Sequence, residues 1–351
     1  MKILILGGTV FLGRHLTEAA LKQGHSVTHL NRGISNPNIF PEVETLLGDR
    51  NKPFSFSPSH YWDAIIDTSG FSPISFKALT DLLVDKTNYY VFISSRSVYE
   101  NFTKHHITEE YPTQELSYYD QKLSEETYGG FKAECERIIR FYDSVNSLVI
   151  RSGLLIGPYD QSGRLSYWIR RMTNRLEVLS PGSKDKPVQV LDVRDLATWI
   201  IRMLEQRKGG VYNACGPLMS MQNFLHILHQ STQSESKLVW IPEEYLMKES
   251  DIRKNAFNIF THSKIPMWVP NNYEGLMTID SQKAIREGLE FRELSSTILD
   301  HPFFLSKKNI DHQQGYKNSM LSFKRETQII QSWKNQCDLA RKEHINNGHK
   351  L

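Results

Sequence analysis

Short apolar runs alternate with stretches of helical spacing along the first half of the chain. The sequence predicts strands over 2–6, 26–30, 45–47, 64–67, 89–94 and 148–150. Several of these runs are apolar throughout, which is typical of strands buried on both faces of a parallel sheet. Between the first two runs, Leu12, Leu16, Ala19 and Ala20 recur at helical spacing. This alternation of strands and helices predicts an α/β fold with a doubly wound parallel sheet.

The second half of the chain is less regular. It predicts a helix over 165–174, a strand over 188–193 and a helix over 195–206, with Asp195 in reach of the N-cap of the last helix. Arg170 and Arg171 fall on the first of these helices. We expect them to form a solvated arginine face, although they could clamp an anionic or flat substrate.

A glycine-rich turn follows the first predicted strand directly and precedes the first predicted helix. It runs from Gly7 to Gly13 with the sequence Gly-Gly-Thr-Val-Phe-Leu-Gly. A strand, a tight turn and a helix N-terminus in this order form a site for the pyrophosphate of a dinucleotide, because the helix end attracts negative charge. The turn therefore predicts a nucleotide site rather than a plain connector.

The same turn resembles that of the extended short-chain dehydrogenase/reductases, the NAD-dependent epimerase/dehydratase family. The family's loop has three glycines in a GxxGxxG pattern, whereas this chain has Val10 in the middle position. That departure resembles an atypical branch of the family, which includes reductase-like proteins and plant stem-loop RNA-binding relatives. The resemblance covers about residues 1–300 and implies a Rossmann-like fold.

The end of the second predicted strand bears on the choice of cofactor. NAD enzymes generally carry an acid there for the ribose 2′-hydroxyl, but this chain has Asn31 followed by Arg32. Arg32, with Arg14 as a second candidate, could pair with a 2′-phosphate, so we favour NADP(H) over NAD(H). Asp49 resembles the family's acid near the adenine. The residues expected to contact the cofactor are Gly7, Gly8, Thr9, Phe11, Leu12, Gly13, Asn31, Arg32, Asp49, Ser69 and Gly70.

The family's chemistry uses a tyrosine and a lysine four residues apart on a helix. Such residues share one helix face about 5–6 Å apart, so the ammonium can favour the tyrosinate. Two such pairs occur, Tyr118/Lys122 in a polar stretch and Tyr128/Lys132 at the opening of a helix predicted over 133–142. We select Tyr128 and Lys132 and interpret the intervening Gly129-Gly130 as room for substrate or nicotinamide.

A third catalytic group is expected where the strand over 89–94 ends. The segment from Val91 to Tyr99 resembles the family's strand that ends in two small hydroxyl residues, and Ser95 matches the catalytic hydroxyl. Sugar-nucleotide dehydratases of the family carry Asp-Glu after that position, whereas this chain has Arg96-Ser97. That form of dehydration is therefore not expected.

Composition excludes several other classes. Hydrophobic residues make up 39% and charged residues 23% of the 351 residues, as in globular rather than disordered proteins. The three cysteines lie far apart without CxxC spacing, so neither a disulfide scaffold nor a zinc site is expected. No apolar run reaches the length of a membrane span. We expect a cytoplasmic protein that binds no metal and does not associate with a membrane.

The basic excess belongs to the end of the chain. Lys and Arg total 42 against 39 Asp and Glu, but residues 301–351 contain nine of the former and four of the latter. The remaining 300 residues are slightly acidic, so a nucleic-acid partner is not expected for them.

These features predict three parts and one leading function. We expect a dinucleotide-binding domain over 1–155 joined by 188–215, a substrate lobe over 156–187 and 216–300, and a basic helical extension over 301–351. The leading hypothesis is an NAD(P)-dependent oxidoreductase acting on a carbonyl or alcohol of a small molecule. The alternatives are a sugar-nucleotide epimerase with the same residues and a stem-loop RNA-binding protein with vestigial chemistry. Homodimers are frequent in the resembling family, so a homodimer is a further possibility.

Overall fold

The computed structural model describes residues 1–52, 55–57, 59–116, 123–255, 264–301 and 320–348. Its contacts divide the chain into two compact units. Unit 1 comprises Met1–Asp160, Gln189–Leu218 and Asn272–Pro302. Unit 2 comprises Gln161–Val188, Met219–Asn271 and Phe303–Leu351. This division differs from the expected parts at two places: residues 272–300 group with the sheet rather than with the smaller lobe, and the C-terminal segment groups with unit 2.

Unit 1 is built on one seven-stranded sheet with the order β10-β6-β5-β4-β1-β2-β3. The strands are β1 (Lys2–Leu6), β2 (Ser26–Asn31), β3 (Glu44–Leu47), β4 (Ala64–Asp67), β5 (Tyr89–Ser95), β6 (Asn146–Ser152) and β10 (Gly210–Ala214). All neighbouring pairs are parallel, and Ile3 of β1 lies between Val27 of β2 and Ala64 of β4. The predicted doubly wound, Rossmann-like α/β fold is confirmed.

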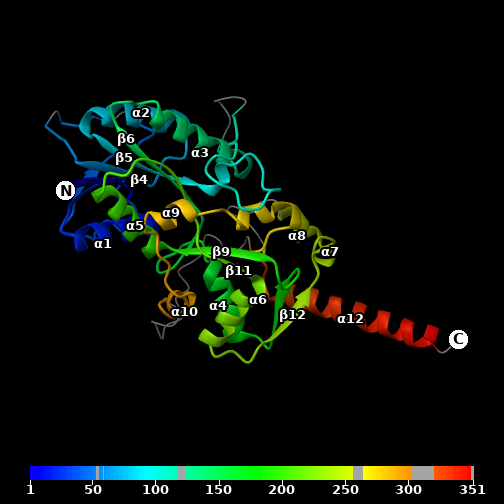
Figure 1. Cartoon of the computed structure of the whole chain (residues 1–351). Coiled ribbons are helices and arrows are strands. Elements are labelled where there is room, and N and C mark those ends of the chain that lie inside the picture. Colours follow the sequence, from blue (N-terminus) through cyan, green and yellow to red (C-terminus); the bar gives the residue numbers. More distant parts are fainter. Residues whose placement is uncertain (53–54, 58, 117–122, 256–263, 302–319, 349–351) are drawn as a thin grey trace. The chain divides into compact units, whose positions relative to one another are not determined.

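Helices cover both faces of this sheet (Figure 1). They are α1 (Phe11–Lys22) and α5 (Val193–Glu205) on one face, and α2 (Pro73–Leu83) and α3 (Glu125–Arg140) on the other. Alternate strand residues serve the two cores, because successive side chains point to opposite faces. Ile3 and Ile5 pack with Leu16 of α1, whereas Leu4 and Leu6 pack with Phe76 of α2.

Shorter elements lie wholly or mostly in unit 1. They are β7 (Leu154–Ile156), β9 (Pro187–Asp192), α9 (Gln282–Arg286), α10 (Leu294–Leu299) and the 3-10 turns η1 (Val84–Lys86), η2 (Arg96–Val98) and η3 (Asn271–Met277). β7 and β9 pair in parallel. The predicted helix over 195–206 begins two residues earlier, because Asp192 rather than Asp195 is its N-cap and accepts a hydrogen bond of 2.8 Å from the amide of Arg194.

Unit 2 contains the parallel strand pair β8 (Glu177–Pro181) and β12 (Lys237–Ile241). Its helices are α4 (Arg164–Asn174), α6 (Met221–Ser231), α7 (Glu243–Leu246), α8 (Ser250–Asn255) and α12 (Phe323–Gly348), and β11 (Leu218–Ser220) leads into α6. The first turns of α12 pack on β8 and β12 with Ile329 and Ile330 buried. The C-terminal helix is therefore part of the unit 2 core rather than an extension beyond it.

A buried ion pair fixes α12 to α4 inside unit 2. Arg171 Nε lies 2.7 Å from Glu326 Oε2, and their side chains are only 4% and 1% exposed. The other carboxylate oxygen accepts a hydrogen bond of 3.0 Å from the amide of Leu179, and Arg171 donates to the carbonyl of Leu321. The expectation of a solvated face is therefore wrong for Arg171, because its guanidinium is buried in an ion pair with Glu326 of the C-terminal helix.

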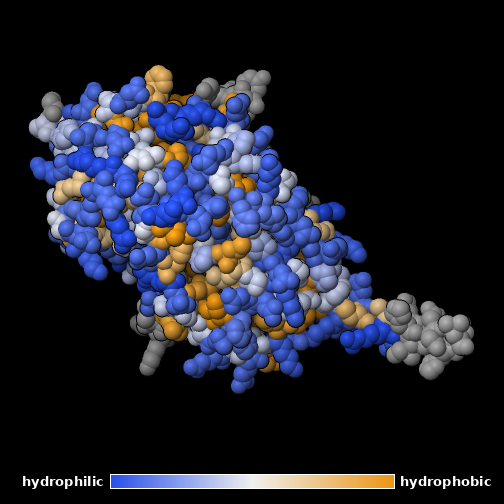
Figure 2. Space-filling view, viewed as in Figure 1, coloured by the Kyte–Doolittle hydropathy of each residue, from blue (hydrophilic) through white to orange (hydrophobic). Residues whose placement is uncertain are grey.

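Hydrophilic residues predominate on the face shown in Figure 2, and hydrophobic ones show as smaller patches among them. Most globular proteins expose scattered apolar side chains in this way. In the part of the chain that the structure describes, no helix combines the length and the hydropathy that crossing a membrane would require.

Candidate active site

The glycine turn after β1 has the close approaches that a phosphate loop requires. A side chain at Gly13 would place its Cβ 2.6 Å from the amide nitrogen of Gly8, so only glycine lets α1 pack against the turn. A side chain at Gly8 would overlap the ring of His29 in β2, and the backbone of Gly8 has a positive φ of 82°. The Thr17 hydroxyl lies 2.9 Å from both His29 Nε2 and the carbonyl oxygen of Gly13, which holds the turn in place.

A cavity of about 540 Å³ opens above this turn. It is lined by the turn itself and by the segments that follow β2, β3 and β4, at the carboxyl edge of the parallel sheet, where ligands bind in doubly wound folds. All the predicted cofactor residues except one line it, namely Gly7, Gly8, Thr9, Phe11, Leu12, Gly13, Asn31, Arg32, Asp49 and Ser69. The exception is Gly70, where a Cβ would lie 2.6 Å from the Phe76 ring, so this glycine serves packing below the cavity.

Asn31 stands where many dinucleotide sites have an acid, and its amide is already engaged. Its Oδ1 accepts a hydrogen bond of 2.7 Å from the amide of Gly33, and its Nδ2 donates to the carbonyl of Gly7 at 3.3 Å. Arg32 beside it is exposed and lines the cavity. The second predicted phosphate partner, Arg14, does not line the cavity: it donates to Glu18 at 2.8 Å and stacks on the ring of Tyr159.

Arg50 is a second cation of the cavity, and it was not predicted from the sequence. Its Nη2 lies 2.9 and 2.8 Å from the two carboxylate oxygens of Asp67, which is fully buried at the end of β4. Tyr90 and the amide of Ser69 also donate to that carboxylate, at 3.1 and 2.8 Å. The sequence does contain a signal for this partner, because Asp67 ends an otherwise apolar strand. A buried carboxylate needs a charged partner, which indicates a nearby cation.

Tyr128 and Lys132 lie on α3, which begins earlier than predicted. Ser124 and Thr127 form a capping box that starts the helix at Glu125, so Tyr128 lies in its first turns. A Cβ at Gly129 would overlap the carbonyl oxygen of Ser97, and one at Gly130 would lie 2.7 Å from Leu116. These glycines thus let α3 pack against its own domain, rather than leaving the predicted room for substrate or nicotinamide. The rival pair, Tyr118 and Lys122, lies outside the described residues.

Lys132 is buried beneath the carboxyl end of β5. Its Nζ donates a hydrogen bond of 2.7 Å to the carbonyl of Ile93, and the rings of Phe71 and Phe92 flank it at 4.7 and 4.8 Å. Burial lowers the pKa of this ammonium to about 8. Phe71 also lines the cavity, and its ring centroid lies 6.4 Å from that of Tyr128. Phe71 is thus the described residue that connects the cavity with the predicted catalytic pair.

Ser95 closes β5 and begins the 3-10 turn η2. Its hydroxyl donates to Ser97 Oγ at 2.9 Å and accepts from the amide of Ser97 at 3.1 Å. The preceding Ser94 donates instead to the buried Glu136 of α3. Ser95, Tyr128 and Lys132 therefore lie around the end of β5, and none of them is among the residues that line the cavity.

A buried charge pair joins α3 to the sheet beside these groups. Arg151 of β6 lies 2.8 Å from Glu136 Oε2, and both side chains are almost fully buried. Arg151 also donates to the hydroxyl of Tyr99 at 3.2 Å, and Tyr99 donates in turn to Asn213 of β10. This network fixes the position of the helix that carries Tyr128 and Lys132.

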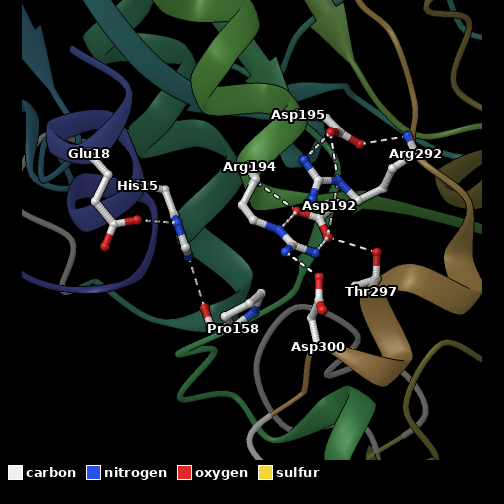
Figure 3. Close-up of polar contacts among 9 residues, drawn as sticks. All are labelled: His15, Glu18, Pro158, Asp192, Arg194, Asp195, Arg292, Thr297 and Asp300. Carbon is white, nitrogen blue, oxygen red and sulfur yellow. Dashed lines mark hydrogen bonds and ion pairs between the residues drawn. The ribbon is translucent and has the colours of Figure 1, made fainter. Parts of the chain in front are cut away.

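Two further polar clusters of unit 1 are drawn in Figure 3. In one, the carboxylate of Asp192 accepts from Arg194 at 2.8 Å and from Thr297 at 2.7 Å, and Arg194 extends to Asp300. In the other, His15 of α1 bridges Glu18 and the carbonyl of Pro158, at 3.0 and 3.1 Å. Both clusters connect helices to loops. Within the described ranges, no group of three or more His, Cys, Asp or Glu could hold a metal ion.

Comparisons with known proteins agree with this architecture. The family model of the NAD dependent epimerase/dehydratase family matches residues 3–69 and 76–215, which is more than half of the chain. The chain therefore belongs to the NAD-dependent epimerase/dehydratase family. The resemblance drawn from the glycine turn and the Tyr/Lys pair is confirmed at this level.

Solved structures with the same fold include two epimerases. The UDP-N-acetylglucosamine 4-epimerase of Methanobrevibacter ruminantium M1 is 15% identical, with a TM-score of 0.65 and coverage of 87% of this chain and 97% of that one. The UDP-glucuronic acid 4-epimerase of Bacillus cereus, in complex with NAD, is 15% identical, with a TM-score of 0.61 and coverage of 87% and 96%.

One curated relative has a different description. It is the chloroplast stem-loop binding protein of 41 kDa b of Arabidopsis thaliana, 26% identical over 234 residues. The match covers 61% of this chain and 58% of the length of that protein.

Proposed function

We propose that the chain moves hydride between a nicotinamide dinucleotide and a carbonyl or alcohol carbon of a small molecule, with Ser95, Tyr128 and Lys132 as its catalytic residues. The observation that carries this proposal is the position of Phe71, which lines the phosphate-loop cavity and contacts both the Tyr128 ring and the Lys132 ammonium. A ligand that fills the cavity past Phe71 reaches the catalytic pair.

The cavity suits a dinucleotide. Its volume of about 540 Å³ falls in the range of cofactor sites, and the Gly8–Gly13 contact brings the N-terminus of α1 against its floor. The helix terminus and the amides of the turn bind the pyrophosphate. Asp49 and Asn51 lie beyond β3 and border the adenosine end.

A bound nicotinamide dinucleotide supplies the acceptor or donor of hydride. Tyr128 exchanges a proton with the substrate oxygen, and the charge of Lys132 on the same helix face favours the tyrosinate. The Ser95 hydroxyl holds that oxygen once it turns away from Ser97. The buried pair Arg151–Glu136 keeps α3 from shifting while the proton moves.

The direct test of this proposal is a titration of the purified chain with NADPH and with NADH, followed by cofactor turnover over a panel of carbonyls and sugar nucleotides. We expect saturable binding with a stoichiometry of one per chain. A chain that binds neither nucleotide would contradict the proposal.

Within this proposal, NADP(H) is the preferred cofactor. The supporting observations are that the Asn31 amide is hydrogen-bonded to the turn, and that Arg32, which lines the cavity, follows an asparagine rather than an acid. Replacing Arg32 by alanine is expected to weaken NADPH binding by about 10–100-fold, the equivalent of one charge-assisted hydrogen bond, and to leave NADH binding within about twofold. Isothermal titration with both nucleotides measures this.

Arg14→Ala is the matched control for that prediction. Arg14 is held by Glu18 and Tyr159 outside the cavity, so both affinities are expected to stay at the wild-type level. Equal weakening of NADPH and NADH in Arg32→Ala would mean that Arg32 contacts the shared pyrophosphate and not a 2′-phosphate.

An epimerase that oxidises and re-reduces one centre of a sugar nucleotide is the second candidate. The epimerase structures that share the fold favour it, and it requires the same three side chains. Cofactor that stays bound through purification, together with inversion of a sugar nucleotide without net consumption of added cofactor, would favour this candidate over the reductase.

The stem-loop binding relative supports a third candidate. It predicts RNA binding that weakens steeply with salt and survives the loss of Tyr128. RNA binding without nucleotide turnover would favour it over both enzymes.

A further inference from the structure

Phe71 lies in the loop between β4 and α2, and its ring has two different surroundings. One part belongs to the cavity lining, and the residue as a whole is 41% exposed. Another part covers α3: the ring centroid lies 6.4 Å from that of Tyr128 and 4.7 Å from Lys132 Nζ. The ring therefore stands between the cavity and the ammonium group.

The Lys132 ammonium is shielded from the cavity and from solvent by the groups around it. The residue is 2% exposed, and the carbonyl of Ile93 accepts the hydrogen bond that the structure gives its Nζ. An ammonium group has three N–H donors, and the faces of Phe71 and Phe92 flank the rest of it. No atom of a ligand in the cavity can contact Nζ while the Phe71 ring keeps this position.

The two rings differ in their freedom to move. Phe92 is 0% exposed, and its ring centroid lies 4.8 Å from that of Phe76, so it is part of the core. Phe71 is on a loop and is 41% exposed, so its ring is not locked into the core as that of Phe92 is. A single cation–π contact is modest in strength, so contacts to a ligand can replace it.

We propose that Phe71 is a gate between the cofactor cavity and the Tyr128/Lys132 pair: its ring shields the Lys132 ammonium in the free chain and swings aside when the nicotinamide half of the cofactor binds. This inference rests on the proposed function. It makes Phe71 a positioning residue, because it controls when Lys132 can act without taking part in the chemistry.

The shielding can be measured without activity. Competitive labelling with trace acetic anhydride between pH 7 and 10.5 gives the limiting reaction rate of each lysine, with the Lys132 peptide identified by mass spectrometry. The limiting rate at high pH is compared, because uncovering the amine also changes its protonation. Phe71→Ala is expected to raise the limiting rate of Lys132 at least tenfold, with exposed Lys77 as the internal reference.

Phe71→Tyr is the matched control, because it keeps the ring and is expected to keep the wild-type rate. Far-ultraviolet circular dichroism and thermal melting show that the variants are folded. An unchanged Lys132 rate in a folded Phe71→Ala chain would overturn the proposal.

The movement can be measured through binding. Opening the gate costs free energy only for a ligand that has the nicotinamide half, so the apparent affinity of such a ligand is reduced in the wild-type chain. We compare the dinucleotide that the wild-type chain binds with its adenosine half, 2′,5′-ADP for NADPH or ADP for NADH. Phe71→Ala is expected to tighten dinucleotide binding three- to tenfold and to leave binding of the adenosine half within twofold.

The outcomes separate the gate from the proposed function. Weaker dinucleotide binding in Phe71→Ala, at unchanged affinity for the adenosine half, would mean that the ring is a platform for the nicotinamide and would overturn the gate. A wild-type chain that binds no nucleotide would contradict the proposed function, and the labelling rate would then decide whether Phe71 shields Lys132.

Discussion

Replacing Tyr128 by phenylalanine is expected to lower kcat by about 10²–10⁴-fold, the usual contribution of a positioned proton donor. The hydroxyl is the only group removed, and the ring that contacts Phe71 remains. Affinity for the dinucleotide is therefore expected to stay within about twofold of wild type, because the hydroxyl acts in the transition state and not in binding the cofactor. Steady-state kinetics and nucleotide titration of the same preparation measure both quantities.

Tyr118→Phe is the matched control, since Tyr118 belongs to the other YxxxK pair in the chain. It is expected to leave kcat unchanged. A loss of turnover in Tyr118→Phe with full activity in Tyr128→Phe would move the catalytic role to the other pair. Full activity in both variants would contradict the proton transfer proposed for this family member.

Replacing Glu326 by glutamine is expected to lower the free energy of unfolding by about 3–5 kcal/mol, because it leaves the charge of Arg171 buried without its partner. The two side chains are 4% and 1% exposed, so water cannot take over the lost interaction. Burial raises the pKa of Glu326, and the Arg171 guanidinium opposes this rise by favouring the carboxylate. Urea unfolding followed by tryptophan fluorescence measures the loss.

Two controls bracket this prediction. Lys334→Gln removes the ion pair with Glu177 from the same helix, but those side chains are 41% and 36% exposed, so the loss is expected to stay below about 1 kcal/mol. The double variant Arg171→Met/Glu326→Leu removes both charges and is expected to recover most of the stability. A loss of less than about 1 kcal/mol in Glu326→Gln would contradict the buried pair.

Local patterns were sufficient for six of the seven strands of the sheet and for the phosphate loop, but they did not predict β10. Continuous apolar runs such as residues 3–6 predicted buried parallel strands, because only strands covered on both faces are apolar throughout. The spacing of Gly7 and Gly13 predicted the turn, because the Gly13 approach to Gly8 depends on residues close in sequence. The cofactor residues came from these same strand ends, and all but Gly70 line one cavity.

Features that depend on distant residues could not be predicted. The sequence predicts a solvated position for Arg171, because its partner, Glu326, comes from the distant C-terminal helix. Asp195 appeared to be a helix cap, but Arg292 donates to its carboxylate and Asp192 takes the cap. Gly129 was interpreted as room for a ligand. The carbonyl of Ser97 instead requires glycine there, because a side chain would overlap its oxygen. In each case the deciding atom is supplied by a part of the chain that no local pattern indicates.

The three-segment construction of unit 2 has a consequence for its synthesis. Arg171 is separated by 150 residues from Leu321, the carbonyl of which it binds, and α12 is synthesised after the other helices of unit 2. At about 5–20 residues per second, this guanidinium waits roughly 8–30 s for its partners. During that interval β8 and β12 lack the helix that covers them. A nascent chain stalled before α12 would therefore present unit 2 to chaperones and proteases, with all seven strands of the sheet in unit 1 already synthesised.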